Sequence, residues 1–189
     1  MMAGEEDAFV ALYRRRQGGI YRFAVQMSGN AILAEDVTQE VFMTLIRDPK
    51  RYDAKRGTLS AYLYGIARNH ILRRLQIERA FVPLPEETGA LGNSNGHATA
   101  FQAHAENLTR TETVGQVRQA VLSLPPNYRE IVVLCDLHEL SYEEAATALG
   151  CAVGTVRSRL HRARALLLEK LRQRTEPLRR AAACSKAGR

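Results

Sequence analysis

The chain has 189 residues, of which 27 are Lys or Arg and 20 are Asp or Glu, so its formal net charge is +7. This basic balance favours a polyanionic partner, because cations that neutralise phosphates release condensed counterions, although charge alone does not choose among DNA, RNA and an anionic membrane. No stretch approaches the ~18 apolar residues of a membrane-spanning helix, and the acidic first residues do not resemble a signal peptide, so we expect a cytoplasmic protein without membrane insertion. Three cysteines without C-x-x-C spacing predict neither a disulfide framework nor a metal site, and we expect no cofactor.

The hydrophobic pattern divides the chain into two helical segments with a stretch of different composition between them. Residues 81–100 contain two prolines and a Gly/Asn/Ser cluster, which is typical of a flexible linker, since loops of ~20 residues are uncommon inside a compact domain. We therefore predict an all-α protein of two small helical domains. Its predicted parts are a first domain over residues 5–79, a flexible linker over 80–110, a second domain over 111–175 and a basic tail over 176–189.

The first segment contains three predicted helices. One begins near Asp7 and is broken at Ser28-Gly29-Asn30, and a second covers residues 31–47 and ends at Asp48-Pro49. Apolar residues at spacings of three and four give the second helix a core-facing side. They are Ala34, Val37, Val41 and Leu45. A polar loop over residues 50–57 precedes a third helix over about 58–79.

The other face of the second helix gathers acidic and polar side chains around a methionine. They are Glu35, Asp36, Gln39, Glu40, Met43 and Arg47. Acidic groups beside a flexible apolar side chain suit a basic protein partner. A solvated helix face without a partner is the alternative that the residues alone leave open.

The third helix and the loop before it mix aromatic, basic and amide side chains. The set consists of Tyr52, Lys55, Arg56, Tyr62, Arg68, Asn69 and Arg73. Aromatic faces stack on unpaired bases while cations hold the phosphate backbone, so this mixture predicts binding of single-stranded nucleic acid. The alternative is that tyrosines of this stretch, with Tyr64 among them, belong to the core.

The second segment predicts a helix-turn-helix. After a start at Pro125-Pro126 and an apolar helix, Ser141 and Glu144 have the spacing of a capping box for a short helix over residues 142–149. Gly150 follows that helix and suits a left-handed C-terminal position. A final helix is expected from about Val153 to Arg172, so the two helices and their turn form the DNA-binding motif.

The final predicted helix has one apolar and one basic face. Val156, Leu160, Ala163 and Leu167 share a side that would pack on the short helix. The opposite side, together with the helix start, presents Thr155, Arg157, Ser158, His161 and Arg162. Long donors and a small hydroxyl at this end of the helix suit the major groove of DNA. A solvated basic helix is the alternative.

Residues 124–171 resemble region 4 of the extracytoplasmic-function (ECF) sigma factors of the sigma-70 family, above all in LSYEEAA (140–146) and VGTVRSRLHRAR (153–164). Residues 9–75 resemble sigma region 2, in the stretches LAEDVTQEVFMTLIR and RYDAKRGTLSAYLYGIARNHILRRL. The resemblance implies a transcription initiation factor that binds core RNA polymerase and promoter DNA and is regulated by an anti-sigma factor. It implies contacts with the clamp helices of the largest polymerase subunit, made by the polar face of residues 31–47, and with the flap of the second-largest subunit.

The same resemblance assigns the two predicted nucleic-acid surfaces to two promoter elements. It implies that the final helix reads the −35 element and that the Tyr and basic residues over 52–73 capture the −10 element. The predicted linker corresponds to a connector that threads the polymerase channels, although a passive tether explains its composition equally well. Two residues depart from the family pattern: Asp136 stands where an Arg often contacts phosphate, and Tyr62 stands where Trp is common.

Three other functions are compatible with parts of the sequence. A helix-turn-helix regulator would bind duplex DNA without polymerase. An enzyme would need a motif such as a Walker-type glycine loop, H-E-x-x-H or G-x-S-x-G, and the sequence contains none of these. A thiol or metal sensor would use Cys135 or Cys151, for which a small buried residue is the simpler interpretation.

Overall fold

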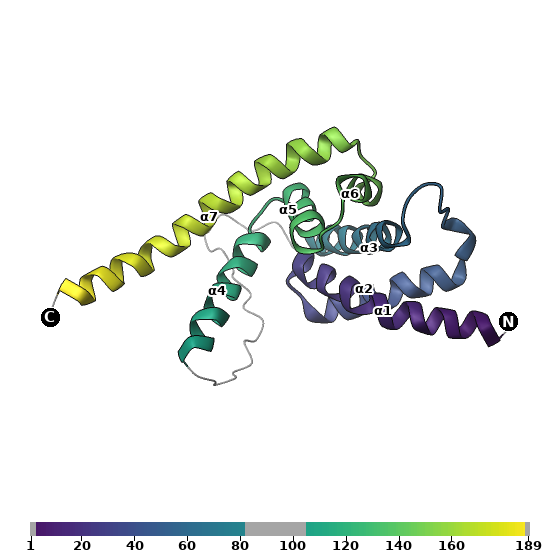
Figure 1. Ribbon diagram of the computed structural model, residues 1–189, viewed down its shortest axis with the longest axis horizontal. Coiled ribbons are helices and arrows are strands. Elements are labelled where there is room, and N and C mark those ends of the chain that lie inside the picture. The colour runs from purple at the N-terminus through teal and green to yellow at the C-terminus, as the bar shows by residue number, and fades with distance from the viewer. Residues whose placement is uncertain (1–2, 82–104, 188–189) are drawn as a thin grey trace.

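The computed structural model describes the backbone of residues 3–81 and 105–187 and the side chains of residues 6–77 and 113–173. The elements in these ranges are helical and no strand occurs among them, so the predicted all-α class is confirmed (Figure 1). The helices are α1 (Ala3–Ser28), α2 (Ala31–Arg47), the 3-10 turn η1 (Pro49–Arg51), α3 (Leu59–Phe81), α4 (Ala105–Leu122), α5 (Pro126–Val132), the π-helical turn η2 (Val133–Leu137), α6 (Tyr142–Leu149) and α7 (Val153–Ala187). Most of the predicted linker lies outside the described residues.

Helices α1, α2 and α3 form a first unit whose boundaries follow local signals. The Asn30 side chain accepts a hydrogen bond of 3.1 Å from the backbone N–H of Leu33 and so caps α2. All four apolar residues predicted for the core side of α2 are buried. They pack in one cluster with Phe23 of α1 and Leu63 of α3, which are fully buried. This packing turns the polar face of α2 outward.

Helices α4 to α7 form a second unit that contains the predicted helix-turn-helix. The Ser141 side chain accepts a hydrogen bond from the Glu144 N–H, and the Glu144 carboxylate accepts one from the Ser141 N–H, so the predicted capping box is present. Gly150 ends α6 with φ of +65°, a backbone conformation that only glycine adopts without steric cost. The capping box fixes the start of α6, and Gly150 fixes its end at the turn into α7.

The structure differs from the predicted helix ends at three places. The second helical segment begins at Ala105, upstream of the expected start near residue 111, and α7 continues to Ala187 through the stretch expected to be a tail. The run of Leu, Arg and Ala after Pro177 has high helix propensity, which explains the continuation. The apolar helix after Pro126 widens into η2, where the His138 N–H bonds to the Val133 carbonyl at 3.0 Å.

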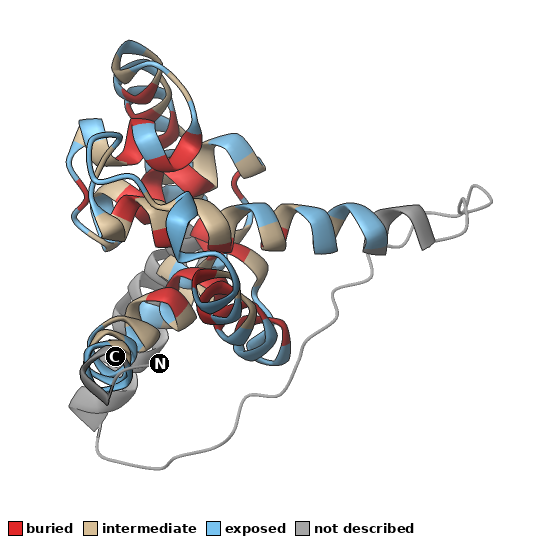
Figure 2. Cartoon of the chain, turned by 90° about the vertical axis from the view of Figure 1, so that its right-hand side faces the viewer, coloured by how far each residue is buried: buried red, intermediate tan, exposed pale blue. Residues whose placement is uncertain are grey.

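The two units are packed against each other and share one hydrophobic core. Helix α6 packs across α3, while α4, α5 and η2 contact α1 (Figure 1). Ile131, Val132, Val133 and Leu134 are all buried, because their helix contacts α7 on one side and α1 on the other. Buried residues therefore form one cluster that runs through both units (Figure 2). The sequence predicted two units but gave no indication of this interface.

No helix in the described part of the chain is long and apolar enough to cross a membrane.

Candidate nucleic-acid interface

Helix α7 presents the predicted basic face to solvent. Val156, Leu160 and Ala163 are buried against the rest of the second unit, as the apolar pattern predicts. The side chains of Arg157, Ser158, His161 and Arg162 are exposed and Thr155 is half-buried. The structure therefore brings the five candidate residues together along the first turns of α7, where they form a surface that we call the α7 basic face.

Two short contacts orient side chains of the α7 basic face. The guanidinium of Arg157 lies 5.8 Å from the centre of the Tyr142 ring, a cation–π distance that links α7 to the start of α6. The Ser158 hydroxyl donates a hydrogen bond of 3.1 Å to the Thr155 carbonyl, so its oxygen keeps acceptor capacity toward a base or phosphate. Both side chains are thus partly ordered before any ligand arrives.

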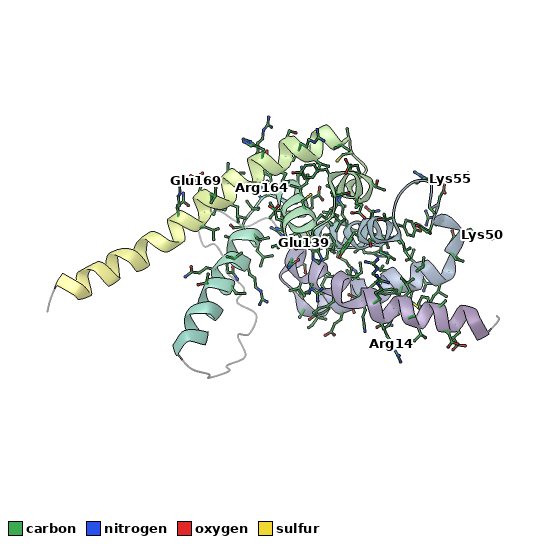
Figure 3. All side chains as sticks on the ribbon, in the orientation of Figure 1. Arg14, Lys50, Lys55, Glu139, Arg164 and Glu169 are labelled. Atoms are coloured by element: carbon green, nitrogen blue, oxygen red, sulfur yellow. The ribbon has the colours of Figure 1, made fainter. Side chains whose placement is uncertain are left out.

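Asp136 forms an ion pair with a further arginine of α7. Its carboxylate accepts hydrogen bonds of 2.6 Å and 3.1 Å from the Arg164 guanidinium, in a two-pronged geometry. The hydrogen bonds to Asp136, and then its charge, raise the pKa of Arg164. Arg164, labelled in Figure 3, lies seven residues after Arg157 and therefore on nearly the same side of the helix. Asp136 therefore neutralises the charge of Arg164, which lies at the edge of the α7 basic face.

The first unit carries the aromatic candidate surface. The Tyr52 and Tyr62 rings lie 5.5 Å apart, and the Tyr52 hydroxyl donates a hydrogen bond of 3.3 Å to the Gly57 carbonyl. Both tyrosines are half-buried, whereas Tyr64 is a core residue that packs on Phe23. The charged and amide candidates Lys55, Arg56, Asn69 and Arg73 are exposed. Figure 3 shows Lys55 on the loop that precedes α3.

Arg68 of this set forms an ion pair with a residue of the second unit. Its Nε donates a hydrogen bond of 2.7 Å to Glu130 Oε2, and a second guanidinium nitrogen lies 3.3 Å from Oε1. Glu130 belongs to α5 of the second unit and is 1% exposed. The sequence assigned Arg68 to nucleic acid, and the structure places it in an ion pair between the two units.

A cleft of about 1120 Å³ separates the aromatic surface from the second unit. Its wall in the first unit includes Tyr52, Arg56, Tyr62, Arg68 and Asn69. Its opposite wall belongs to α6 and the turn into α7, with Glu143, Thr147, Cys151 and Val153. Most of the residues predicted to hold single-stranded nucleic acid therefore face the helix-turn-helix.

The polar face of α2 lies on the outside of the molecule. Glu35, Asp36, Gln39, Met43 and Arg47 are exposed and Glu40 is half-buried. The sequence analysis missed two exposed apolar residues of α2. They are Ile32 and Ile46, whose exposed fractions are 73% and 42%. Exposed apolar side chains among acidic groups are a composition that suits a protein partner.

The thiol of Cys135 is poorly suited to redox sensing. Burial raises its pKa to about 11, so the thiolate is scarce at neutral pH. Cys151 is half-buried in the wall of the cleft. This environment favours the interpretation of Cys135 as a packing residue.

Sequence comparisons match the two units to two known families. The model of sigma-70 region 2 matches residues 12–80, and that of sigma-70 region 4 matches residues 115–167. The chain is 37% identical over 161 residues to the ECF RNA polymerase sigma factor SigE of Mycolicibacterium smegmatis, covering 85% of this chain and 60% of that one. It is 31% identical over 175 residues to the ECF RNA polymerase sigma factor SigW of Bacillus subtilis, covering 89% and 91%. The chain belongs to the ECF sigma factors of the sigma-70 family.

Known solved structures also share the fold of this ECF sigma factor. One is RpoE from Bartonella quintana in complex with the anti-sigma factor NepR, at 24% identity and a TM-score of 0.64, covering 89% of this chain and 97% of that one. Another is CnrH in complex with the cytosolic domain of CnrY, at 24% identity and a TM-score of 0.65, covering 89% and 90%. In this ECF sigma factor, the first unit carries the region 2 match and the second unit carries the region 4 match.

Proposed function

We propose that this ECF sigma factor binds core RNA polymerase and directs it to promoters, reading the −35 element with the α7 basic face and the −10 element with the aromatic surface of the first unit. The observation that carries the proposal is that one chain holds both surfaces in the family's order. A duplex-reading helix alone would suit a repressor. The aromatic and basic surface on a separate unit adds the single-strand chemistry that promoter opening needs.

Within this proposal each set of residues has a separate role. Arg157, Ser158, His161 and Arg162 contact base edges or phosphates, while Thr155 and the N-terminal amides of α7 contact phosphate. Tyr52 and Tyr62 stack on unpaired bases, and Lys55, Arg56, Arg68, Asn69 and Arg73 hold the strand. The polar face of α2 docks on the clamp helices of the largest polymerase subunit, and the second unit docks on the flap of the second-largest subunit.

The proposal also covers regulation and location. One similar solved structure is a sigma factor in complex with an anti-sigma factor, and this supports an anti-sigma factor as the regulator of this chain as well. The parts assigned from the sequence are region 2 over residues 5–79, a linker over 80–110, region 4 over 111–175 and a basic tail over 176–189. The protein acts in the cytoplasm as a binding factor and not as an enzyme.

Run-off transcription with purified core polymerase tests this function. The wild-type chain should co-elute with core polymerase and support transcription from its promoter. Arg157→Ala and Arg162→Ala should each weaken −35 recognition by about 1–3 kcal/mol if the side chains reach base edges. The matched control is Arg118→Ala, which removes an exposed arginine from α4 and should leave recognition unchanged.

Two outcomes would contradict parts of this proposal. Equal losses on promoters with a scrambled −35 element would make Arg157 and Arg162 phosphate contacts rather than base contacts. A stable complex with duplex promoter in the absence of core polymerase, combined with no co-elution with core, would identify a helix-turn-helix regulator instead.

A further inference from the structure

A second pocket lies between α1, α3 and the segment that follows η2, apart from the residues assigned to the promoter. Its volume of about 400 Å³ falls in the range of small-molecule sites. The charged side chains on its lining are Arg15, Arg16 and Arg22 of α1 and Glu139 of the second unit, and we call it the arginine pocket. Three arginines and one glutamate give its lining a formal charge of +2.

The arginines of this pocket have no acidic partner of their own. Within residues 6–77 and 113–173, none of the three forms an ion pair with a carboxylate. The Nε of Arg16 is buried and has no hydrogen-bond acceptor among the same residues. A buried N–H without an acceptor costs free energy, and neighbouring like charges repel each other. A water molecule could accept the hydrogen bond, but only an anion would also neutralise the charge.

Two of the arginines act on the same point of the pocket wall. Arg16 and Arg22 stand six positions apart in α1. Burial raises the pKa of Tyr64, and the positive charges of both arginines oppose this rise. Burial, and then the charge of Arg22, lowers the pKa of His138 to about 4, so its imidazole is neutral at pH 7. The positive charges therefore converge on a wall that adds no charge of its own.

The uncharged polar residues of the pocket comprise a fixed wall and a hydrogen-bond donor. The Tyr64 hydroxyl lies 2.9 Å from Nδ1 of His138, and Nε2 of His138 lies 2.8 Å from Oε1 of Gln26. A neutral ring satisfies both contacts when Nε2–H donates to Gln26 and Nδ1 accepts from Tyr64. Ser60, the second residue of α3, also lines the pocket, at the helix end whose N–H groups and dipole favour anions.

We propose that the arginine pocket binds the phosphate group of a small molecule. Its arginines and Ser60 donate to the phosphate oxygens, and the ligand joins α1 and α3 to the second unit. A phosphate monoester carries a charge of about −1.5 to −2 at pH 7 and three acceptor oxygens, which matches the charge of the pocket and the forked donors of arginine. A carboxylate carries a single charge and would leave the pocket positive. This site is additional to the promoter-reading surfaces.

Thermal unfolding and calorimetric titration of the full chain test this site. The probes are inorganic phosphate, pyrophosphate and ATP, each compared with succinate at the same ionic strength. The phosphate-bearing probes should raise the Tm in a saturable manner, as expected of a ligand that binds only the folded chain, and succinate should not. The assay contains neither polymerase nor DNA, so its result does not depend on the proposed function.

The same probes identify the source of the phosphate group. Equal affinities for the three would show that free phosphate is sufficient, and tighter binding of ATP would identify a nucleotide. Both results support the proposal. Absence of saturable binding by every probe would overturn it, as would binding of succinate as tight as that of phosphate. Arg16-dependent binding of a single-stranded oligonucleotide in preference to all three probes would also overturn it, because the arginines would then belong to a nucleic-acid surface.

Arg16→Gln tests whether binding occurs in this pocket. The variant should bind phosphate at least about tenfold more weakly, the factor that corresponds to one charge-assisted hydrogen bond. The matched control is Arg14→Gln, the same change at an exposed position of α1 outside the pocket, and it should keep the wild-type affinity (Figure 3). Because Arg16 is half-buried, Arg22→Gln at an exposed position repeats the test if Arg16→Gln fails to fold. Equal affinities of the pocket variant and its control would overturn the proposal.

Glu139→Gln should have the opposite effect. Glu139 is exposed and is the acid on the described lining of the pocket, so its substitution removes a repelling charge without disturbing the core. The affinity for phosphate should rise by about threefold, as expected for one like charge several ångströms away near the protein surface. Glu169→Gln removes an exposed acid of α7 away from the pocket and should leave the affinity unchanged. An unchanged or lower affinity of Glu139→Gln would show that phosphate binds elsewhere and would overturn the assignment.

Discussion

Asp136 and Arg164 neutralise each other at the edge of the surface that we assign to the −35 element. The side chains are 28% and 53% exposed, so the pair lies within reach of solvent and of a docked duplex. An aspartate this close to DNA repels phosphate unless a cation accompanies it. The pair therefore holds the affinity of this ECF sigma factor for duplex DNA below what its count of arginines on α7 suggests.

Asp136→Asn should strengthen duplex binding and make it more sensitive to salt. The substitution removes the repelling charge and releases Arg164 for one additional phosphate contact, so the slope of log K against log salt should steepen by about 0.9. Fluorescence anisotropy with the holoenzyme and a −35 duplex at several salt concentrations measures this slope. Arg164→Gln should leave the wild-type slope nearly unchanged, and an unchanged slope for Asp136→Asn would show that Arg164 cannot reach phosphate.

His138 makes the stability of the chain depend on pH. Its pKa is lowered from 6.5 to about 4, mainly by burial and further by the charge of Arg22. Between these two values the unfolded chain binds the proton and the folded chain does not. The contribution of neutral His138 to the free energy of unfolding is therefore complete above pH 6.5 and is lost as the pH falls toward 4.

Denaturant unfolding at pH 7 and pH 5 checks this dependence. The wild-type chain should lose stability over this interval, and His138→Gln should lose less, because glutamine keeps a polar contact but does not titrate. The comparison is between the two pH-dependent losses, so a uniformly lower stability of the variant does not affect it. Equal losses of unfolding free energy in both proteins would mean that carboxylates, and not His138, cause the loss of stability at acidic pH.

At the scale of single helices, the first helix of the helix-turn-helix, α6, begins at the capping box of Ser141. Both reciprocal hydrogen bonds are made, and the N–H of Ser141 together with the Thr58 hydroxyl lowers the pKa of Glu144. Ser141→Ala should lower the free energy of unfolding by about 1 kcal/mol, since it removes an N-cap acceptor. Glu143→Gln, an exposed acid in the same turn, serves as the control and should change stability little. Chemical denaturation of both variants measures the difference, and equal stabilities would exclude a role for the cap.

Helix boundaries with a local cause could be predicted from the sequence. Residues 31–47 and 142–149 match α2 and α6 because each helix has a capping side chain at its start and a stop signal at its end. The surface candidates on α7 were found for the same reason, since the 3.6-residue period places Arg157 and His161 opposite buried Val156 and Leu160. Interactions between residues close in the sequence were sufficient to predict these helix boundaries and the exposed residues of α7.

The contacts that control the candidate site could not be predicted in this way. Arg68 and Glu130 are 62 positions apart, and the pattern around Arg68 indicates a cation on a helix without specifying its partner. The π-helical turn η2 likewise lies in a segment that packs against α1, a contact that the local sequence does not specify. The amphipathic faces of helices can be predicted from a single sequence. Which helix or side chain each face contacts depends on the tertiary structure.

At the scale of the whole molecule, the shared core makes the two units thermodynamically dependent on each other. Val41 of α2 and Leu160 of α7 belong to one cluster of buried residues, connected through α3 and α6. Because residues of one packed cluster unfold cooperatively, the two units should unfold as one structure in the free chain. Opening the interface exposes apolar surface as well as the Glu130 carboxylate, and both effects oppose separation of the units.

Native-state hydrogen exchange should reveal this coupling. In the wild-type chain, amides within residues 33–45 of α2 and within residues 156–163 of α7 should exchange with the same opening free energy and the same denaturant dependence. In Glu130→Gln the two sets should separate, with one of them opening at lower free energy, because the ion pair no longer joins the units. Glu169→Gln should keep them together. If the two sets already differ in the wild-type chain, the units unfold independently, and the packed interface contributes too little free energy to couple them.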